Sequence, residues 1–271
     1  MAKIKGFVFY RGPSQIDGSP IVGIATLHSK NSKTGDMVQT WILNDNGLSP
    51  LENIKNGADH SVCGDCKHRR HTGGACYVDV GKAPTQIWKS YMKGNYPIYT
   101  GEVGKYEYTE GIYFGHSEWE KHVQGREVRV GAYGDPFAIP FEVWDWLLQR
   151  ARKHTGYTHQ WQRDDFKYSR ISEICMASVD NEQEYTQAKS KGYRTFRVLS
   201  NQEVTLKPKE FMCPATPEGG NKRTCQTCCA CSGIGIAFQS RNPNKADVAV
   251  VVHGALKKRF TQQTVGTSDT Q

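Results

Sequence analysis

Apolar residues near the start of the chain fall in short runs that have the length of β-strands. These runs cover the first ten residues, residues 20–27 and residues 36–43, and a polar turn containing Lys33, Thr34 and Gly35 separates the last two. Short apolar runs on either side of a turn of this kind are typical of antiparallel hairpins. We therefore predict an N-terminal antiparallel β region over residues 1–58.

The pattern changes over the next stretch of the chain. Residues 59–81 are dense in glycine, histidine, arginine and cysteine and are expected to form a loop. Pro84 then begins a predicted helix, because Ile87, Trp88 and Tyr91 recur at helical spacing after it. Residues 95–125 are rich in tyrosine and glycine and are left unassigned.

From residue 127 onward, predicted strands alternate with predicted helices. One helix begins at Pro140, and another covers residues 181–191 and ends at Gly192. The predicted strands are residues 128–133, 157–161, 173–179, 194–199 and 247–252. This alternation builds a parallel sheet with right-handed crossovers. We predict a single α/β domain over residues 1–260, an irregular (β/α) TIM-like barrel with its β/α core at 127–254. An open doubly wound sheet is the alternative, and residues 261–271 are expected to be a disordered tail.

Composition narrows the class of protein. The chain has 271 residues, of which 37% are hydrophobic, so it has enough apolar residues for a core. It has no run of about eighteen apolar residues that could cross a membrane. The first apolar run is too short for a signal peptide, so we expect a soluble, cytoplasmic protein.

The net charge of +8 favours a polyanionic partner, nucleic acid first, although such a charge can also serve solubility alone.

The cysteines supply the clearest candidate chemistry. Nine cysteines, Cys-x-x-Cys spacings and no secretory signal favour metal binding over disulfides. The late cluster offers Cys213, Cys225, Cys228, Cys231 and the more distant His253. Such thiolates suit a tetrahedral zinc site, and the same spacing suits an iron–sulfur cluster completed by Cys213. Spacing does not decide whether Cys228 or its neighbour Cys229 is the ligand.

An early cluster lies in the loop at residues 59–81. Its thiols are Cys63, Cys66 and Cys76, and a histidine or a distant cysteine could complete a second metal site. The neighbouring basic residues would also suit phosphate contacts. The alternative is a solvated basic loop with incidental thiols. Cys175 falls in a predicted buried strand and is expected to be a core residue.

Polar residues that could act in catalysis follow several predicted strands. Asp135 follows the strand at 128–133, His159 and Gln160 lie at the next strand, and Asp180 follows the strand at 173–179. Loops at the carboxyl ends of parallel strands converge on one face, where active sites form. The alternative is that Asp135 and Asp180 are turn or capping residues. The segment 157–161 could stack on a nucleic-acid base and read its edge, or its Tyr157 and Trp161 could be core residues.

The late cysteine-rich segment and the distant His253, placed late in a barrel-like chain, resemble the tRNA-guanine transglycosylases. Those enzymes are TIM barrels with a structural zinc, and the chain is most similar to phage-encoded relatives that place 7-deazaguanines in DNA. The resemblance covers residues 127–254. The close-spaced cysteines occur in the reverse order here, the family's nucleophile motif has no clear match, and the early cluster has no counterpart.

The resemblance implies a glycosyltransferase that replaces guanine in a nucleic acid, DNA rather than RNA, by a 7-deazaguanine base. An aspartate would form a covalent glycosyl-enzyme, and a second acidic group would move protons. Asp135 and Asp180 are the candidates for this pair, without a choice of nucleophile. His159 and Gln160 would read the flipped base, Tyr133 or Trp161 would stack on it, and zinc would be structural. Two other classes stay open: an iron–sulfur nucleic-acid-modifying enzyme, of the type that uses S-adenosylmethionine, and a non-enzymatic zinc module that binds nucleic acid.

Overall fold

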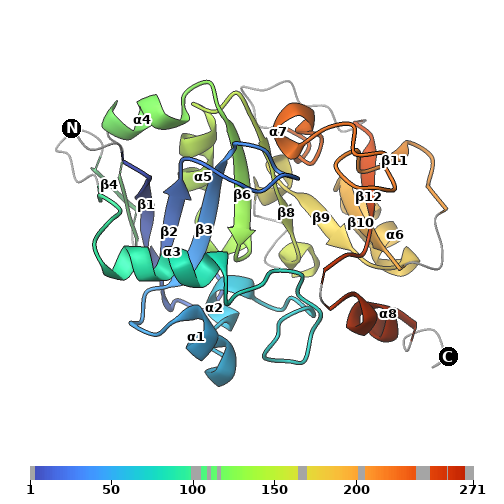
Figure 1. Cartoon of the computed structure of the whole chain (residues 1–271), viewed down its shortest axis with the longest axis horizontal. Coiled ribbons are helices and arrows are strands. Elements are labelled where there is room, and N and C mark those ends of the chain that lie inside the picture. Colours follow the sequence, from blue (N-terminus) through green and yellow to red (C-terminus); the bar gives the residue numbers. More distant parts are fainter. Residues whose placement is uncertain are drawn as a thin grey trace.

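The structure is a computed structural model of the chain. It describes residues 4–98, 105–108, 111–114, 117–163, 170–200, 205–235, 245–254 and 256–265. These residues form a mixed α/β fold with a seven-stranded sheet, in the order β4-β5-β1-β2-β3-β6-β7, and a five-stranded sheet, in the order β11-β12-β10-β9-β8 (Figure 1). The first sheet comprises β1 (Gly6–Pro13), β2 (Pro20–Thr26), β3 (Val38–Asn44), β4 (Lys105–Tyr108), β5 (Gly111–Phe114), β6 (Glu127–Tyr133) and β7 (Lys153–Thr155). The second comprises β8 (Tyr157–Thr158), β9 (Met176–Val179), β10 (Thr195–Leu199), β11 (Glu210–Met212) and β12 (Asp247–Val251).

The predicted N-terminal antiparallel region is confirmed. Strands β1 and β2 pair antiparallel, and β2 pairs antiparallel with β3, with Ile21 opposite Asn44 and Thr26 opposite Gln39. Every residue of β3 is buried, and the side chains of its three polar residues, Gln39, Thr40 and Asn44, each donate a hydrogen bond within the fold. Strand β3 then pairs in parallel with β6, so the hairpin continues directly into the β/α part of the chain.

The two sheets meet at Gly156. Strand β7 pairs in parallel with β6, β8 pairs in parallel with β9, and Gly156 is the one residue between β7 and β8. A Cβ atom at this position would lie 3.0 Å from the thiol of Cys175 and 3.1 Å from Cβ of Val130. A side chain here would require its neighbours to shift by a few tenths of an ångström, and glycine lets the chain pass from one sheet to the other without that shift.

The β/α core is parallel, as predicted. All strands of the second sheet pair in parallel, through β8–β9, β9–β10, β10–β12 and β11–β12. The TIM-like barrel is not confirmed, because β4 and β11 stand at the outer edges of their sheets within the described residues. The carboxyl ends of β6 and β8 point toward α1 and α2, whereas α7 lies at the opposite end of the molecule (Figure 1).

The helices agree with the prediction where the chain shows a clear period. The predicted helices appear as α3, α5 and α6, and Gly192 follows α6 with a positive φ of 80°. The helix bounds are α1 (Pro50–Asn56), α2 (His60–Cys63), α3 (Ala83–Met92), α4 (Ser117–Val123), α5 (Phe141–Leu148), α6 (Glu182–Ser190), α7 (Cys225–Cys228) and α8 (Lys257–Val265). Among the residues described, no helix is long and apolar enough to cross a membrane.

Several boundaries differ from the prediction, including three at which the structure has another type of element. The strand predicted at 157–161 stops at Thr158, and Gln160–Gln162 form a 3-10 turn. The strand predicted from residue 173 begins at Met176, because Arg170–Glu173 also form a 3-10 turn. Residues 261–265, predicted to belong to a disordered tail, form the end of α8, whose Phe260 packs on His68, and the rest of the predicted tail, 266–271, lies outside the described residues.

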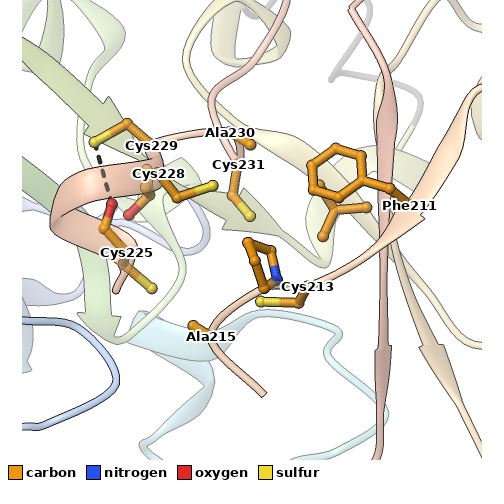
Figure 2. A pocket seen from close by; sticks show the side chains of 11 residues that line it. Phe211, Cys213, Ala215, Cys225, Cys228, Cys229, Ala230 and Cys231 are labelled. Atoms are coloured by element: carbon orange, nitrogen blue, oxygen red, sulfur yellow. Dashed lines mark hydrogen bonds between the residues drawn. The ribbon is translucent and has the colours of Figure 1, made fainter. Parts of the chain in front are cut away.

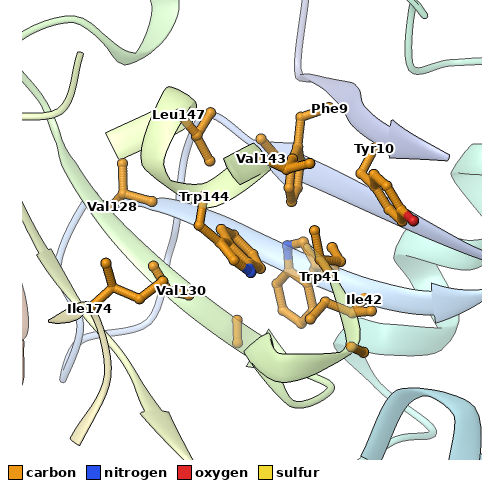
Figure 3. Close-up of a cluster of buried hydrophobic side chains, with 14 of the residues drawn as sticks. Phe9, Tyr10, Trp41, Ile42, Val128, Val130, Val143, Trp144, Leu147 and Ile174 are labelled. Carbon is orange, nitrogen blue, oxygen red and sulfur yellow. The ribbon is translucent and has the colours of Figure 1, made fainter. Parts of the chain in front are cut away.

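Helix α5 packs its apolar side on the first sheet and forms the centre of the core. Trp144 is fully buried, its ring centroid lies 5.2 Å from that of Phe9, and its indole N–H donates to the carbonyl of Pro136 at 2.8 Å. Val128 and Val130 of β6 face the same cluster (Figure 3). Because alternate residues of a strand point to opposite faces, Arg129 and Gly131 point to the other face of the sheet.

Candidate metal centre and acid–base network

The late cysteine segment connects the second sheet to the loop between β2 and β3. The N–H of Cys213 donates to the carbonyl of Ala249 on β12 at 2.8 Å, and the N–H of Gly156 donates to the carbonyl of Cys231 at 2.7 Å. At the start of α7, the N–H of Cys225 donates to the carbonyl of Lys33 at 2.9 Å. Residues far apart in the sequence are thereby held at one place.

Four thiols of this segment converge. Together they line a cavity of about 20 Å³, and their sulfur atoms surround a common space (Figure 2). These thiols belong to Cys213, Cys225, Cys228 and Cys231, which are the four cysteines predicted for the late metal site. The sulfur of Cys229 points away, because it donates to the carbonyl oxygens of Cys225 at 3.2 Å and Gln226 at 3.4 Å.

The surroundings of these thiols act on their ionisation in both directions. Burial raises the pKa of Cys225, whereas the positive charges of Arg129 and Lys33 lower it. Burial also raises the pKa of Cys213, and the N–H of Ala215, which donates to its sulfur, lowers it. Burial and the three other thiols raise the pKa of Cys231 well above its usual value. Four thiols held this close are chemically suited to share one cation as thiolates.

Ligand geometry around a cation is not formed in the structure. Across the described residues, no group of three or more histidine, cysteine, aspartate and glutamate side chains is arranged to hold a metal ion. The convergence of the four thiols is therefore an arrangement of donors, and metal binding by them is a proposal.

The predicted ligand His253 does not join the four thiols. It is exposed beyond the end of β12, its Nδ1 lies 3.2 Å from the carbonyl of Val251, and its ring is 6.3 Å from that of Tyr77. Tyr77 in turn shares a 2.6 Å hydrogen bond with the hydroxyl of Tyr157, and Arg129 donates to both hydroxyls at 2.8 and 3.2 Å. The sequence does not indicate the cluster of Tyr77, Arg129 and Tyr157, because these residues come from a loop and two different strands.

The early cysteines also lie near one another, at the carboxyl ends of β3 and β6. Burial raises the pKa of Cys63, and the neighbouring thiols of Cys66 and Cys76 raise it further. Backbone N–H groups two residues further along donate to two of these sulfurs, that of His68 to Cys66 and that of Val78 to Cys76. Such N–H groups favour the thiolate form, which a metal ligand requires.

Asp135 occupies the end of β6 and joins it to β8. Its carboxylate accepts from the Thr158 hydroxyl at 2.7 Å, from the His159 N–H at 2.7 Å and from the Phe137 N–H at 3.1 Å. Burial raises its pKa to about 6, although these donors act in the opposite direction. Asp135 caps the 3-10 turn Pro136–Ala138, so the predicted capping role is present, together with a perturbed carboxyl group.

Asp180 occupies the equivalent end of β9. One carboxylate oxygen accepts from Nε2 of His68 at 2.6 Å and contacts Nζ of Lys67 at 2.8 Å. Burial opposes ionisation of Asp180, but these two partners outweigh it and lower its pKa to about 2. The cap of α6 is Asn181, whose side chain accepts from the Glu184 N–H at 2.8 Å, so Asp180 is free of the capping role.

Two histidines connect the two aspartates. Nδ1 of His159 lies 3.9 Å from the Asp135 carboxylate, and the rings of His159 and His68 meet edge to face at 5.7 Å. Burial and the nearby His68 lower the pKa of His159 to about 4, so its imidazole is neutral near pH 7. The structure thus brings the predicted Asp135, His159 and Asp180 into one network, to which it adds His68.

The other predicted base-binding residues are placed differently. Gln160 is buried: its amide donates to the Cys63 carbonyl at 3.0 Å and accepts from the Asp65 N–H at 3.1 Å, so it holds the early cysteine loop. Trp161 is a core residue whose indole donates to the Ser178 carbonyl at 2.8 Å. Tyr133 is buried at the end of β6 beside the thiols of the early cluster. These contacts leave Gln160 and Trp161 unavailable to a base.

Comparisons with known proteins add nothing to this geometry: no family model, no curated protein and no solved structure matches the chain.

Proposed function

We propose that the late cysteines bind one zinc ion and that this ion holds the segment 213–231 across the junction of the two sheets. The convergence of Cys213 with the three thiols that begin twelve residues later, at Cys225, carries the proposal. Four unpaired thiols are the donor set of structural zinc sites, in which the free energy of binding becomes free energy of folding. Nine free cysteines also agree with a reducing compartment, for which we propose the cytoplasm.

The adjacent Cys228 and Cys229 provide a matched test. Metal content is measured by mass spectrometry on the purified full chain, on Cys228→Ser and on Cys229→Ser. We expect Cys228→Ser to lose the ion and to unfold at a lower temperature, and Cys229→Ser to keep it, because only the sulfur of Cys228 faces the other thiols. Equal metal content in both variants, or a metal-free wild type, would show that the proposed site is wrong.

An iron–sulfur cluster is the second candidate for the same thiols. The two-residue spacings between Cys225, Cys228 and Cys231, with Cys213 twelve residues before them as a fourth ligand, favour it, since ferredoxin-type clusters use two-residue spacings. Absorbance near ~400 nm in anaerobically purified protein identifies the cluster. Colourless protein with one zinc per chain identifies the first candidate. A second equivalent of metal that disappears in Cys66→Ser would assign the early cluster as a further site.

We further propose that the network at the carboxyl ends of β6 and β9 exchanges a guanine base of a nucleic acid, DNA first, for a 7-deazaguanine. The observation in favour is that two buried carboxyl groups in one network have pKa values of about 6 and about 2. In enzymes with two carboxyl groups of different pKa, the group with the higher pKa transfers protons and the ionised group acts as the nucleophile. Asp180, ionised and with Oδ1 unpartnered among the described residues, is the proposed nucleophile.

The proposed reaction has two displacements. The Asp180 carboxylate forms a bond to C1′ of the nucleotide while the bond from C1′ to guanine breaks, and Asp135 gives a proton to the leaving base. The 7-deazaguanine then attacks C1′ through its ring nitrogen, loses a proton to Asp135 and releases Asp180. His159, neutral and a quarter exposed, is the remaining candidate to contact a base.

The exchange is tested with a radiolabelled 7-deazaguanine and DNA. We expect the wild type to incorporate label, Asp180→Asn to incorporate none, and Asp65→Asn, which alters an exposed carboxylate of the nearby loop, to match the wild type. A wild type that holds its metal, binds DNA and exchanges no base under any condition would leave the chain a non-enzymatic zinc module that binds nucleic acid.

A further inference from the structure

A hollow lined by basic and polar side chains lies beside the four thiols. It has a volume of about 640 Å³ and is enclosed by the loop between β2 and β3 on one side and by the late cysteine segment on the other. We call it the basic groove and define it by Lys33, Lys222 and Arg223, together with the polar side chains of Ser32, Asn221 and Thr224. No acidic residue is among its lining residues.

Among the described residues, the three cations of the basic groove have no anionic partner. All are exposed, and none forms an ion pair with a carboxylate in the described part of the chain. Some basic residues elsewhere are paired, for example Lys67 with Asp180 and Arg197 with Glu210, whereas other exposed lysines of the described ranges are as free of ion pairs as those of the basic groove. The basic groove is distinguished by three such cations that line one hollow without an acidic residue among them. The three cations of the basic groove are therefore available to bind an external anion.

The other lining groups indicate which anion fits. Hydroxyl and amide groups from Ser32, Asn221 and Thr227 stand among the cations, and Ala215 and Pro217 are the apolar residues of the lining. Cations interspersed with neutral donors, without a large apolar anchor, suit the phosphate and sugar groups of a nucleic-acid backbone. A hydrophobic peptide or a flat base surface would require aromatic or aliphatic walls that this hollow lacks.

The shape of the basic groove depends on the proposed metal centre. One wall carries Thr224, which caps α7, and α7 carries the thiols of Cys225 and Cys228. Gln226 attaches this wall to the opposite one through two hydrogen bonds. Its backbone N–H donates to the Thr34 carbonyl at 2.9 Å, and its side-chain oxygen accepts from the Asp36 N–H at 3.1 Å. The helix of this segment, α7, has only four residues, so the position of the segment depends mainly on such bonds, and a metal ion at its thiols would add to them.

We propose that the basic groove binds the phosphate backbone of a nucleic acid and that a metal ion at the four thiols keeps its two walls in register. The inference rests on the proposed metal centre for its second half. The first half, binding of the nucleic-acid phosphate backbone by Lys33, Lys222 and Arg223, depends only on the lining residues of the basic groove. The two halves predict different outcomes when charge and metal are removed separately.

The charge test uses the full-length protein and a fluorescent DNA duplex in anisotropy titrations at several salt concentrations. The variant Lys33→Ala/Lys222→Ala/Arg223→Ala is compared with Lys55→Ala/Lys89→Ala/Lys93→Ala, which removes three exposed lysines from α1 and the end of α3. We expect the first to bind at least ten-fold more weakly and its salt slope to fall by about 3, since each phosphate contact contributes about 0.9. The second should behave as the wild type.

Equal loss in the two triple variants would overturn the basic groove as the binding surface and leave only general attraction to a positive protein. The same titration with phosphatidylserine vesicles separates nucleic acid from a membrane surface. Vesicle binding that depends on the three cations, without DNA binding, would overturn the assignment of the partner.

The metal test compares Cys228→Ser with Cys229→Ser in the same titration. We expect only Cys228→Ser to lose metal and to bind DNA more weakly. If Cys228→Ser keeps the wild-type metal content, the proposed metal centre fails, while the result of the charge test still decides the basic groove. If it loses metal and binds DNA as the wild type does, the coupling between metal and groove is wrong.

Discussion

Asp135 gives the sharpest prediction, because its pKa links one side chain to the stability of the whole fold. Its carboxyl group has an ordinary pKa of 3.8 in the unfolded chain and a pKa of about 6 in the folded protein, where burial is the main cause. The native state therefore holds a proton on Asp135 over a pH range in which the unfolded state has released it. The contribution of Asp135 to the free energy of unfolding is fully present below about pH 4. It falls between about pH 4 and about pH 6 and stays low above about pH 6.

The size of the effect follows from the two pKa values. One pKa unit corresponds to about 1.4 kcal/mol, so a shift from 3.8 to about 6 amounts to about 3 kcal/mol. Asp135→Asn resembles the protonated acid in shape and has no proton to release. Relative to the wild type, the variant should therefore gain about 3 kcal/mol of stability as the pH rises from about 4 to about 7.

The assay is urea unfolding of both proteins at matched pH values, followed by circular dichroism. The difference between the two proteins is the quantity of interest, since it cancels the pH dependence of every group that both share, including the thiols. The variant also loses some free energy of unfolding that does not depend on pH, because its amide NH₂ faces the N–H donor of either Phe137 or His159. Parallel pH profiles of the two proteins would refute the proposed burial and pKa of Asp135.

Two further predictions concern the backbone and a buried ion pair. Gly64 has a φ of 56°, and a Cβ atom there would lie well inside 3.0 Å of the Gln160 side chain, so Gly64→Ala should cost more than about 2 kcal/mol in urea unfolding. Gly73→Ala, with a φ of 78° but open space around the new methyl group, should cost only about 1 kcal/mol, and equal costs would remove the argument from packing. Arg197 donates to the buried carboxylate of Glu210 at 2.9 and 2.5 Å, so Arg197→Leu should cost about 3–5 kcal/mol in thermal or chemical unfolding. Adding Glu210→Leu should recover most of this loss, and a double variant as unstable as the single one would show that lost packing, and not an unpaired charge, is the cause.

The local pattern of the chain was enough to predict its main elements. The apolar runs of β2 and β3, the period of α3 and α5 and the glycine after α6 each reflect forces that act within a few residues, so they can be read without the fold. The burial of Cys175 and the parallel order of the later strands were predicted for the same reason. Beyond these elements, β7 and β11 were missed, because strands of three residues carry too little pattern to be recognised.

The candidate residues at strand ends were predicted as a set, and the tertiary structure separated them. Gln160 donates to the carbonyl of Cys63 and stabilises the early cysteine loop, and Trp161 donates to the carbonyl of Ser178 within the core. Only the folded chain places these carbonyls beside the two side chains. Asp180 contacts His68, which lies 112 residues earlier in the chain, and the neighbouring Lys67, and these two contacts together lower its pKa.

The sequence alone determined which cysteines are close in the chain, and hence that thiol chemistry is the first hypothesis for this protein. Only the tertiary structure decided that Cys213 joins the other three, that Cys229 turns away and that His253 lies elsewhere. The physical reason is that spacing constrains a ligand set only within one turn or loop. The direction of each sulfur and the approach of distant segments depend on backbone hydrogen bonds between the second sheet, Gly156 and the loop between β2 and β3, which form only when the whole chain folds.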